Sequence, residues 1–190
     1  MSLLNKLRET IKESIKSSRK IYVLVGPPGI GKSTWVKNNV ENPYIISRDD
    51  LVDFIRKPLN IKYDDMFSKK ADDLNKEINK LLKKRFAEAA DSNQDIVVDM
   101  TNMNSQSRKN ALNSIQNSEN FEKIAVFFDH RGKEKLVHKS VKMRGQQLND
   151  KNLGPHIING MLNRFEIPTT AEGFDSVITV DPSDALNRHF

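Results

Sequence analysis

The sequence predicts an α/β protein in which five short strands form a parallel sheet covered by helices on both faces. Three observations support this fold class. Five apolar runs of strand length recur along the chain, segments with helical periodicity separate them, and 190 residues suffice for one domain with a proper core. Strands that alternate with helices are usually joined by right-handed crossovers, which make neighbouring strands parallel.

The predicted strands are short and apolar, as expected where helices bury both faces of a parallel sheet. Their ranges are 21–25, 44–47, 95–99, 123–128 and 175–180. The chain contains no internal repeat and no low-complexity linker, so we expect the strands to belong to one domain.

The segments around the strands have the apolar spacing of helices. Helices are predicted over 2–18, 32–41, 64–90, 105–117 and 132–144, together with one from about Asp50 that Pro58 ends and one opened by Pro155 that ends before Pro168. The first of these is amphipathic, with an apolar residue every fourth position. We therefore divide the chain into an N-terminal helix, 1–18, and a main domain, 19–190, and expect the helix to serve packing or an oligomer contact.

Composition excludes several classes of protein. Hydrophobic residues make up 37% and charged residues 29% of the chain, which is typical of a globular protein. No apolar run approaches the roughly 20 residues of a membrane helix, and the N-terminus lacks the apolar core of a signal peptide, so we expect a cytoplasmic protein without a membrane partner. The absence of cysteine excludes disulfides, thiol catalysis and cysteine–zinc sites.

The net charge of +6 favours an anionic partner such as a nucleotide or a nucleic acid, although a charge that serves only solubility is an equal alternative. The excess of basic over acidic residues is concentrated between Arg131 and Arg144, where six basic residues are accompanied by one acidic residue, Glu134. A cluster of this kind is either a solvated helix face or a surface that meets phosphates.

A glycine-rich turn follows the first predicted strand. The stretch G-P-P-G-I-G-K-S, residues 26–33, fits the pattern G-x-x-x-x-G-K-[ST] at every fixed position, and it lies between a strand and a helix as that motif requires. Its glycines allow backbone N–H groups to converge on phosphate oxygens, and the helix that follows adds its positive dipole end. The sequence therefore predicts a P-loop NTPase of the adenylate-kinase-like kind, a three-layer sandwich with a helical lid.

The motif assigns ATP and Mg²⁺ to this turn. Lys32 should reach the β- and γ-phosphates, and the Ser33 hydroxyl should ligate Mg²⁺. The predicted nucleotide-binding residues are Gly26, Pro28, Gly29, Ile30, Gly31, Lys32, Ser33 and Thr34.

Acidic residues follow the second and third strands, whose carboxyl ends should meet the phosphate loop. Asp49 comes first after the second strand and is the candidate to orient an attacking hydroxyl and accept its proton. Capping of the next helix is the alternative for Asp49 and Asp50, and we expect at least one of them to cap. Asp99 ends the third strand and is expected either to hold the magnesium shell or the acceptor, or to serve only as a turn residue.

Residues after the acidic positions complete the predicted site. Thr101 and Asn102 could form hydrogen bonds with the substrate. Arg144 ends the basic helix within a predicted lid at about 131–153, and it is the candidate to neutralise charge on the transferred group; a solvated helix face is the alternative.

The motifs together resemble one family. The stretches G-P-P-G-I-G-K-S-T-W (26–35), S-R-D-D (47–50), D-M-T-N (99–102), M-R-G (143–145) and F-E-I-P-T-T-A-E-G-F (165–174) resemble, in order, the kinase domain of polynucleotide 5′-hydroxyl kinases, both the phage enzymes and the kinase half of the animal kinase/phosphatases. The resemblance implies transfer of the ATP γ-phosphate to the 5′-hydroxyl of DNA or RNA.

The resemblance also implies roles for individual residues. It assigns the general base to Asp49, phosphate contacts to Lys32, Mg²⁺ to Ser33 and transition-state charge to Arg144. Asp50 would cap or support the helix, and the predicted substrate residues are Arg48, Arg56, Asp99, Thr101 and Asn102.

Two departures from the family pattern stand out. The phage enzymes carry a substrate-binding arginine three residues after the catalytic aspartate, where this chain has Val52, and Arg56 is the candidate substitute one turn further on. The chain has no D-x-D phosphatase motif, so any end-healing role would be that of a kinase alone. We expect Trp35 and Tyr63 to pack in the core or against helices.

Two other functions remain open at this stage. The first is a small-molecule kinase on the same scaffold, acting on a sugar, nucleoside or antibiotic hydroxyl, since the fold hosts many substrates. The second is a nucleotide-binding ATPase without kinase activity, which would position a water molecule in place of a hydroxyl acceptor.

Overall fold

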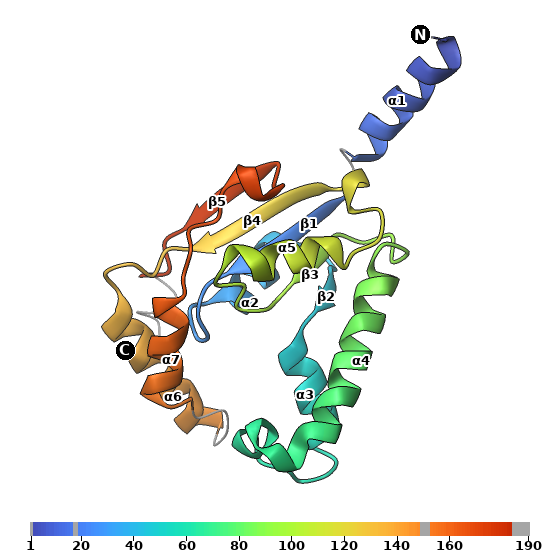
Figure 1. Cartoon of the computed structure of the whole chain (residues 1–190). Helices are drawn as coiled ribbons and strands as arrows, with labels where there is room; N and C mark the ends of the chain where they lie inside the picture. The colour runs from blue at the N-terminus through green and yellow to red at the C-terminus, as the bar shows by residue number, and fades with distance from the viewer. Residues whose placement is uncertain (1, 17–18, 149–152, 184–190) are drawn as a thin grey trace.

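The computed structural model describes residues 2–16, 19–148 and 153–183. Within them, five strands form a single sheet in the order β2-β3-β1-β4-β5, and every neighbouring pair is parallel (Figure 1). The strands are β1 (Lys20–Val25), β2 (Tyr44–Ile46), β3 (Ile96–Val98), β4 (Glu122–Phe128) and β5 (Ser176–Val180). The predicted fold class is confirmed.

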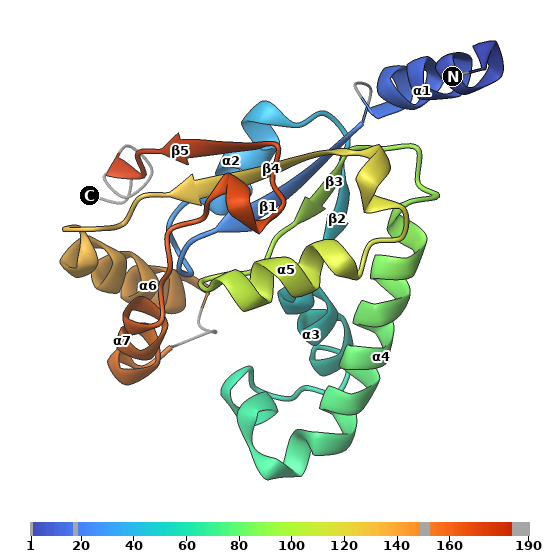
Figure 2. The ribbon, with the colours of Figure 1, turned by 45° about the horizontal axis from the view of Figure 1, so that its top comes forward.

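Helices lie on both sides of the sheet, with α5 on one face and α2 on the other (Figure 2). The helices are α1 (Leu3–Lys16), α2 (Lys32–Asn39), α3 (Arg48–Arg56), α4 (Asp72–Ala89), α5 (Ser105–Asn113), α6 (Glu134–Leu148) and α7 (Pro155–Asn163). Short 3₁₀ turns occupy Asp64–Phe67, Lys69–Ala71, Ser118–Asn120 and Thr170–Glu172.

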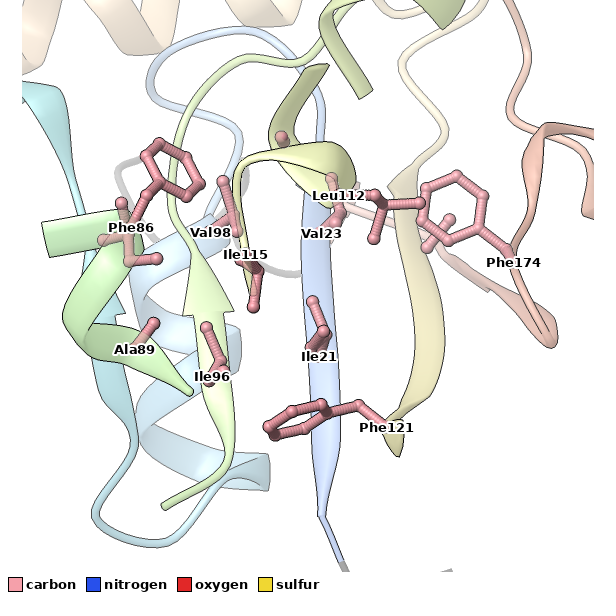
Figure 3. Packing of buried hydrophobic residues seen from close by; sticks show 13 residues of the cluster. Ile21, Val23, Phe86, Ala89, Ile96, Val98, Leu112, Ile115, Phe121 and Phe174 are labelled. Carbon is pink, nitrogen blue, oxygen red and sulfur yellow. The ribbon is translucent and has the colours of Figure 1, made fainter. Parts of the chain in front are cut away.

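Two hydrophobic clusters flank the sheet because successive strand residues face opposite sides. Ile21 and Val23 of β1 point into the first cluster, where they meet Ile96 and Val98 of β3 and side chains of α4 and α5 (Figure 3). The alternate residues of the same strands enter the second cluster with α2, α6 and α7. Burial of both faces explains why these strands are apolar throughout.

The strand order alone indicates at which edge of the sheet a ligand would bind. The connection from β1 leads to β2 at one edge, whereas the connection from β3 passes β1 and reaches β4 on the other side. Ligands of open α/β sheets bind where the connections diverge in this way, outside the carboxyl ends of the strands. The loops after β1 and β3 meet there, and the Gly26 N–H donates to the Thr101 carbonyl oxygen at 3.0 Å.

Several helix boundaries differ from the predictions. The basic helix, which was expected to end at Arg144, continues to Leu148. The helix predicted over 64–90 begins at Asp72, because Ser68 is extended (ψ 157°) and separates two 3₁₀ turns; these turns keep a helix-like apolar spacing. The helix predicted over 105–117 ends at Asn113, and Asn117 has the left-handed conformation (φ 52°). The apolar pattern continues beyond the helix because Ile115 is buried in the first cluster.

The expectation that Asp49 or Asp50 caps the helix after β2 is wrong. Ser47 is the N-cap of α3, and its hydroxyl oxygen accepts a hydrogen bond from the Asp50 N–H at 3.2 Å. Both aspartates lie in the first turn, where their charges interact favourably with the helix dipole. Neither carboxylate is therefore needed as the cap.

The N-terminal helix α1 projects away from the sheet in both views (Figures 1 and 2). Its residue Leu3 is 86% exposed, and Leu4 and Leu7 are also exposed. Among the residues that the structure describes, no helix is both long enough and apolar enough to cross a membrane.

Candidate active site

The phosphate loop between β1 and α2 depends on glycine at two kinds of position. Gly29 (φ 74°) and Gly31 (φ 97°) adopt left-handed conformations that other residues rarely take. Glycine is favoured at position 26 by close packing, since a Cβ atom on Gly26 would lie 3.1 Å from Cβ of Phe128. A Cβ atom on Gly29 would also lie 3.2 Å from Oγ of Ser140, so glycine lets α6 approach the loop.

Lys32 is the first residue of α2, and its side chain folds back over the loop. Its Nζ donates to the carbonyl oxygens of Gly26 at 3.0 Å and Pro27 at 2.9 Å. The ammonium group is thus held against the loop whose N–H groups would bind phosphate. The contact of Lys32 with the β- and γ-phosphates stays a prediction.

A side-chain hydrogen bond connects the end of the phosphate loop to the residue that follows β3. The Ser33 hydroxyl donates to Oδ2 of Asp99 at 3.2 Å, and the Asp99 N–H donates to the Ile46 carbonyl oxygen of β2 at 2.9 Å. Ser33 and Asp99, which are 66 residues apart in the chain, are therefore brought together as the sequence predicts.

The electrostatic environment of Asp99 is mixed. Burial raises the pKa of the Asp99 carboxyl, and the charges of Asp50 and Asp49 raise it further, while Lys32 and the Ser33 hydrogen bond act in the opposite direction. A cation placed beside this carboxylate would relieve the unfavourable burial of its charge.

The residues present fit a bound Mg²⁺. Ser33 and Asp99 supply hard oxygen ligands side by side. Among the described residues, no three acidic, histidine or cysteine side chains gather in a way that could hold a metal ion by themselves. Mg²⁺ in phosphoryl-transfer sites typically needs only one or two protein oxygens, because substrate phosphates and water complete its shell.

Asp49 lies in the first turn of α3, at the carboxyl end of β2. Its side chain is exposed, and its Oδ1 accepts a hydrogen bond from the Tyr63 hydroxyl at 3.0 Å. Because β2 and β3 are parallel neighbours and Asp49 and Asp99 follow their carboxyl ends, both residues lie at the same edge of the sheet. The role of Asp49 as a base stays a prediction.

The loop after β3 uses Asn102 to hold its own shape. Asn102 is 3% exposed, has a left-handed backbone (φ 45°), and donates from Nδ2 to the Leu24 carbonyl oxygen at 2.9 Å. This side chain therefore fastens the loop to β1 in the structure. Contacts of Asn102 and Thr101 with a substrate stay predictions.

The two arginines of α3 are both engaged by the protein. Arg48 donates to Oδ1 of Asn75 in α4 at 2.8 Å. Arg56 is 5% exposed, and its Nε donates to Oδ1 of Asp53 at 2.7 Å. Val52, at the position where the resembled phage enzymes carry arginine, is fully buried. The predicted substrate contacts of Arg48 and Arg56 are not tested by these interactions.

The basic helix α6 touches the phosphate loop through Ser140. This residue is 2% exposed, and its hydroxyl donates to the Gly29 carbonyl oxygen at 2.9 Å. Arg144 follows one helical turn later in α6. The Arg144 side chain and residues 149–152 of the predicted lid lie outside the described part of the structure, so the role of Arg144 stays a prediction.

A buried arginine that the sequence analysis did not single out organises the loop after β3. Arg108 of α5 is fully buried and donates to both carboxylate oxygens of Glu172, from Nε at 2.6 Å and from Nη2 at 2.8 Å. Its Nη1 donates to the carbonyl oxygens of Asn102 at 3.1 Å and Glu166 at 3.0 Å. The segment 165–174 thus holds α5 and the D-M-T-N loop together.

A hollow of about 120 Å³ lies beside the phosphate loop. Thr34 and Trp35 of α2 line it together with Phe128 and Pro182. The Trp35 ring meets Phe128 edge to face, with centroids 6.5 Å apart. Trp35 thus packs against the core, as expected, and also presents a wall to this hollow.

The fold and this edge of the sheet define a P-loop protein of the α/β kinase-like kind. A family model described as an AAA domain matches residues 21–168. Because that match covers more than half of the chain, the protein belongs to this AAA-domain family. A search of curated proteins finds no match.

Solved structures with a similar fold include kinases. A proposed kinase from Chloroflexus aurantiacus J-10-fl superposes with a TM-score of 0.59 at 13% identity, over 90% of this chain and 93% of that one. A fungal RNA kinase superposes with a TM-score of 0.51 at 17% identity, and the match covers 90% of this chain and 81% of that one. A gluconokinase from Sinorhizobium meliloti 1021 superposes with a TM-score of 0.49 at 15% identity, and the match covers 90% of this chain and 89% of that one. At these identities, the first two similarities establish the fold alone.

Proposed function

We propose that this protein is an ATP-dependent kinase that transfers the γ-phosphate to the 5′-hydroxyl of DNA or RNA. The observation that carries the proposal is the Ser33–Asp99 hydrogen bond, which lies at the same edge of the sheet as Asp49. It gathers a phosphate loop, a pair of oxygen ligands and a separate exposed carboxylate at one edge of the sheet. Phosphoryl transfer to a hydroxyl requires these parts together.

In the proposed reaction, the oxygen of the acceptor hydroxyl forms a bond to the γ-phosphorus, and the bond from that phosphorus to the β–γ bridging oxygen breaks. The hydroxyl proton passes to the Asp49 carboxylate, and ADP leaves with the bridging oxygen. Asp49 orients the acceptor before it receives the proton. The position of Asp49 in the first turn of α3, which is separate from the phosphate loop, supports this role.

The donor side of the reaction is assigned to the phosphate loop. The loop N–H groups and Lys32 would bind the β- and γ-phosphates. Mg²⁺ held by Ser33 and Asp99 would neutralise charge on the phosphate oxygens when bound. The hollow beside Trp35 would take the nucleoside of the donor, because it adjoins the loop and is walled by an aromatic ring.

The nucleic-acid acceptor rests on the motifs. The S-R-D-D and D-M-T-N stretches, in this order, resemble polynucleotide 5′-hydroxyl kinases. The lysines of α6 add basic charge on the helix that contacts the phosphate loop through Ser140. The same fold supports a fungal RNA kinase, which makes the acceptor class compatible with the scaffold.

The test is transfer of labelled γ-phosphate from ATP to DNA and RNA oligonucleotides that carry a 5′-hydroxyl. Asp49→Asn should lower kcat by about 100-fold or more, because a positioned acid–base group contributes roughly 10²- to 10⁴-fold. Asp50→Asn is the matched control, since it removes the same charge from the same helical turn. We expect it to keep most of the activity.

Equal losses in Asp49→Asn and Asp50→Asn would contradict the assignment of the base. Wild-type protein that binds ATP but labels neither DNA nor RNA would contradict the nucleic-acid acceptor. Label on a sugar, nucleoside or antibiotic hydroxyl would then identify a small-molecule kinase, and release of phosphate with no acceptor labelled would identify an ATPase.

A further inference from the structure

We propose that Tyr63 is a positioning residue for Asp49, and that its hydroxyl holds Oδ1 so that Oδ2 is presented to the acceptor. This inference rests on the proposed function, in which Asp49 receives the proton of the acceptor hydroxyl. It adds a residue from the segment between α3 and α4, which neither the phosphate-loop motif nor the S-R-D-D motif contains.

The hydrogen bond joins a buried side chain to an exposed one. Tyr63 is 5% exposed and packs in a cluster of apolar residues between α3 and α4, whereas Asp49 faces solvent. The Tyr63 hydroxyl donates to Oδ1 of Asp49 at 3.0 Å. A buried tyrosine normally directs its hydroxyl to a partner. This fixed donor restricts the rotation that a surface carboxylate would otherwise keep.

The position of the Tyr63 ring is itself supported by Arg56. The Arg56 guanidinium lies over the ring, with its Cζ 5.5 Å from the centroid, and its Nε donates to Oδ1 of Asp53 at 2.7 Å. Nη1 of Arg56 also donates to the Ile61 carbonyl oxygen at 3.4 Å, two residues before Tyr63 in the chain. Arg56 would thus influence Asp49 through the position of the Tyr63 ring.

The phenol is suited to act as a permanent donor. Burial raises the pKa of Tyr63, and the charge of Asp49 and its hydrogen bond raise it further, while the nearby charge of Arg48 opposes this effect. Tyr63 therefore stays protonated through the neutral range. A carboxylate has about four acceptor sites on its two oxygens, so the hydrogen bond from Tyr63 to Oδ1 is compatible with a further hydrogen bond from an acceptor hydroxyl.

A double-mutant cycle on phosphate transfer tests whether Tyr63 acts through Asp49. Tyr63→Phe should lower kcat about tenfold, which corresponds to one oriented hydrogen bond, and should leave the KM for ATP unchanged. In the Asp49→Asn background, Tyr63→Phe should cause no further loss, because its target has already been removed. A tyrosine that served only to stabilise the fold would give multiplicative losses.

Tyr44→Phe is the matched control. The Tyr44 hydroxyl is buried but forms no hydrogen bond among the described residues, so its removal should leave kcat at the wild-type value. Thermal unfolding midpoints of all variants check that the proteins remain folded. A wild-type kcat in Tyr63→Phe, or independent losses in the cycle, would overturn the inference.

A second measurement separates this inference from the proposed function. With tyrosine labelled at Cζ with ¹³C, Asp49→Asn should move the Tyr63 resonance from its wild-type position, because the hydrogen bond from the Tyr63 hydroxyl to Oδ1 of Asp49 is altered. The Tyr44 resonance should not move. If the Tyr63 resonance is insensitive to Asp49, the inference is overturned whatever the acceptor is; if transfer to oligonucleotides fails while the coupling persists, the proposed function alone is overturned.

Discussion

The Ser33 hydroxyl donates a hydrogen bond to Oδ2 of Asp99 at 3.2 Å and thereby joins the start of α2 to the end of β3. Ser33 lies directly after the phosphate-loop lysine, and Asp99 lies beside the edge strand that leads to Asp49. This contact thus places the proposed magnesium ligands beside the strand that leads to the proposed base. The consequences of this arrangement can be measured residue by residue.

Asp99 is expected to lower the stability of the nucleotide-free protein at neutral pH. Burial raises the pKa of Asp99, so the folded state binds the proton more tightly than the unfolded state does. The stabilisation that this carboxyl provides is present below its unfolded-state pKa and is lost as pH rises through its folded-state pKa. Asp99→Asn should therefore raise the neutral-pH unfolding midpoint, and the difference from wild type should shrink as pH falls.

The same variant should lose function. Because a bound metal ion needs the ionised carboxylate, Mg²⁺ and ATP should stabilise wild type but not Asp99→Asn, and transfer should fall by about 100-fold. In wild type, the Mg²⁺ concentration needed for half-maximal transfer should increase as pH falls through the raised pKa of Asp99. An Asp99→Asn protein that is less stable without nucleotide, or that responds to Mg²⁺ as wild type does, would refute this prediction.

Lys32→Met should abolish productive ATP binding with little effect on the fold. The change keeps the alkyl stem and removes the ammonium group that Gly26 and Pro27 hold over the loop. We expect kcat/KM for ATP to fall by roughly 10²- to 10³-fold, the range seen when a group that stabilises transition-state charge is removed. Lys37→Met, in the last turn of the same helix, is the control and should behave as wild type. Similar kinetics for the two variants would exclude Lys32 from phosphate binding.

Ser140→Ala should weaken ATP binding, because it removes a contact between α6 and the phosphate loop. Its hydroxyl is the donor to the Gly29 carbonyl oxygen, and a lost buried hydrogen bond costs on the order of 1 kcal/mol, or about fivefold in affinity. Ser114→Ala is the matched control, because that exposed hydroxyl donates to a carbonyl oxygen within α5. Equilibrium titration with ATP distinguishes the outcomes, and equal affinities for both variants would count against a role of α6 in shaping the loop.

Arg108→Lys should be strongly destabilising. Lysine cannot reproduce the two-point contact with Glu172 while also donating to Asn102 and Glu166, and breaking a buried ion pair costs about 3–5 kcal/mol. Urea unfolding measures the loss. Arg131→Lys provides the matched comparison, because Arg131 makes a similar two-point contact with Asp129 at the surface. A destabilisation of Arg108→Lys no greater than that of Arg131→Lys would contradict the proposed organising role.

The parts of the site that the sequence could reveal are local in the chain or follow from parallel strands. The phosphate loop is a continuous motif, so Lys32 and Ser33 could be placed directly. The convergence of Asp99 with Ser33 could be predicted because the carboxyl ends of neighbouring parallel strands meet at one edge.

Other parts could not be predicted, because their partners are distant and carry no periodic signal. The apolar spacing of residues 64–71 continues through 3₁₀ turns, which hid the true start of α4 at Asp72. Tyr63 was expected only to pack, and its burial agrees, but its contact with Asp49 depends on how those turns fold back. Arg108 looks like a surface residue of a polar helix until its partner Glu172, 64 residues later, is placed beside it.

The most direct test of the central claim follows the γ-phosphate of ATP in one reaction that contains a 5′-hydroxyl oligonucleotide, a mixture of sugar and nucleoside hydroxyl acceptors, and water. Wild type should place most of the label on the 5′ end of the oligonucleotide, and Asp49→Asn should place almost none there. Label found chiefly on a small hydroxyl compound or as free phosphate would contradict the assignment of this protein as a polynucleotide 5′-hydroxyl kinase.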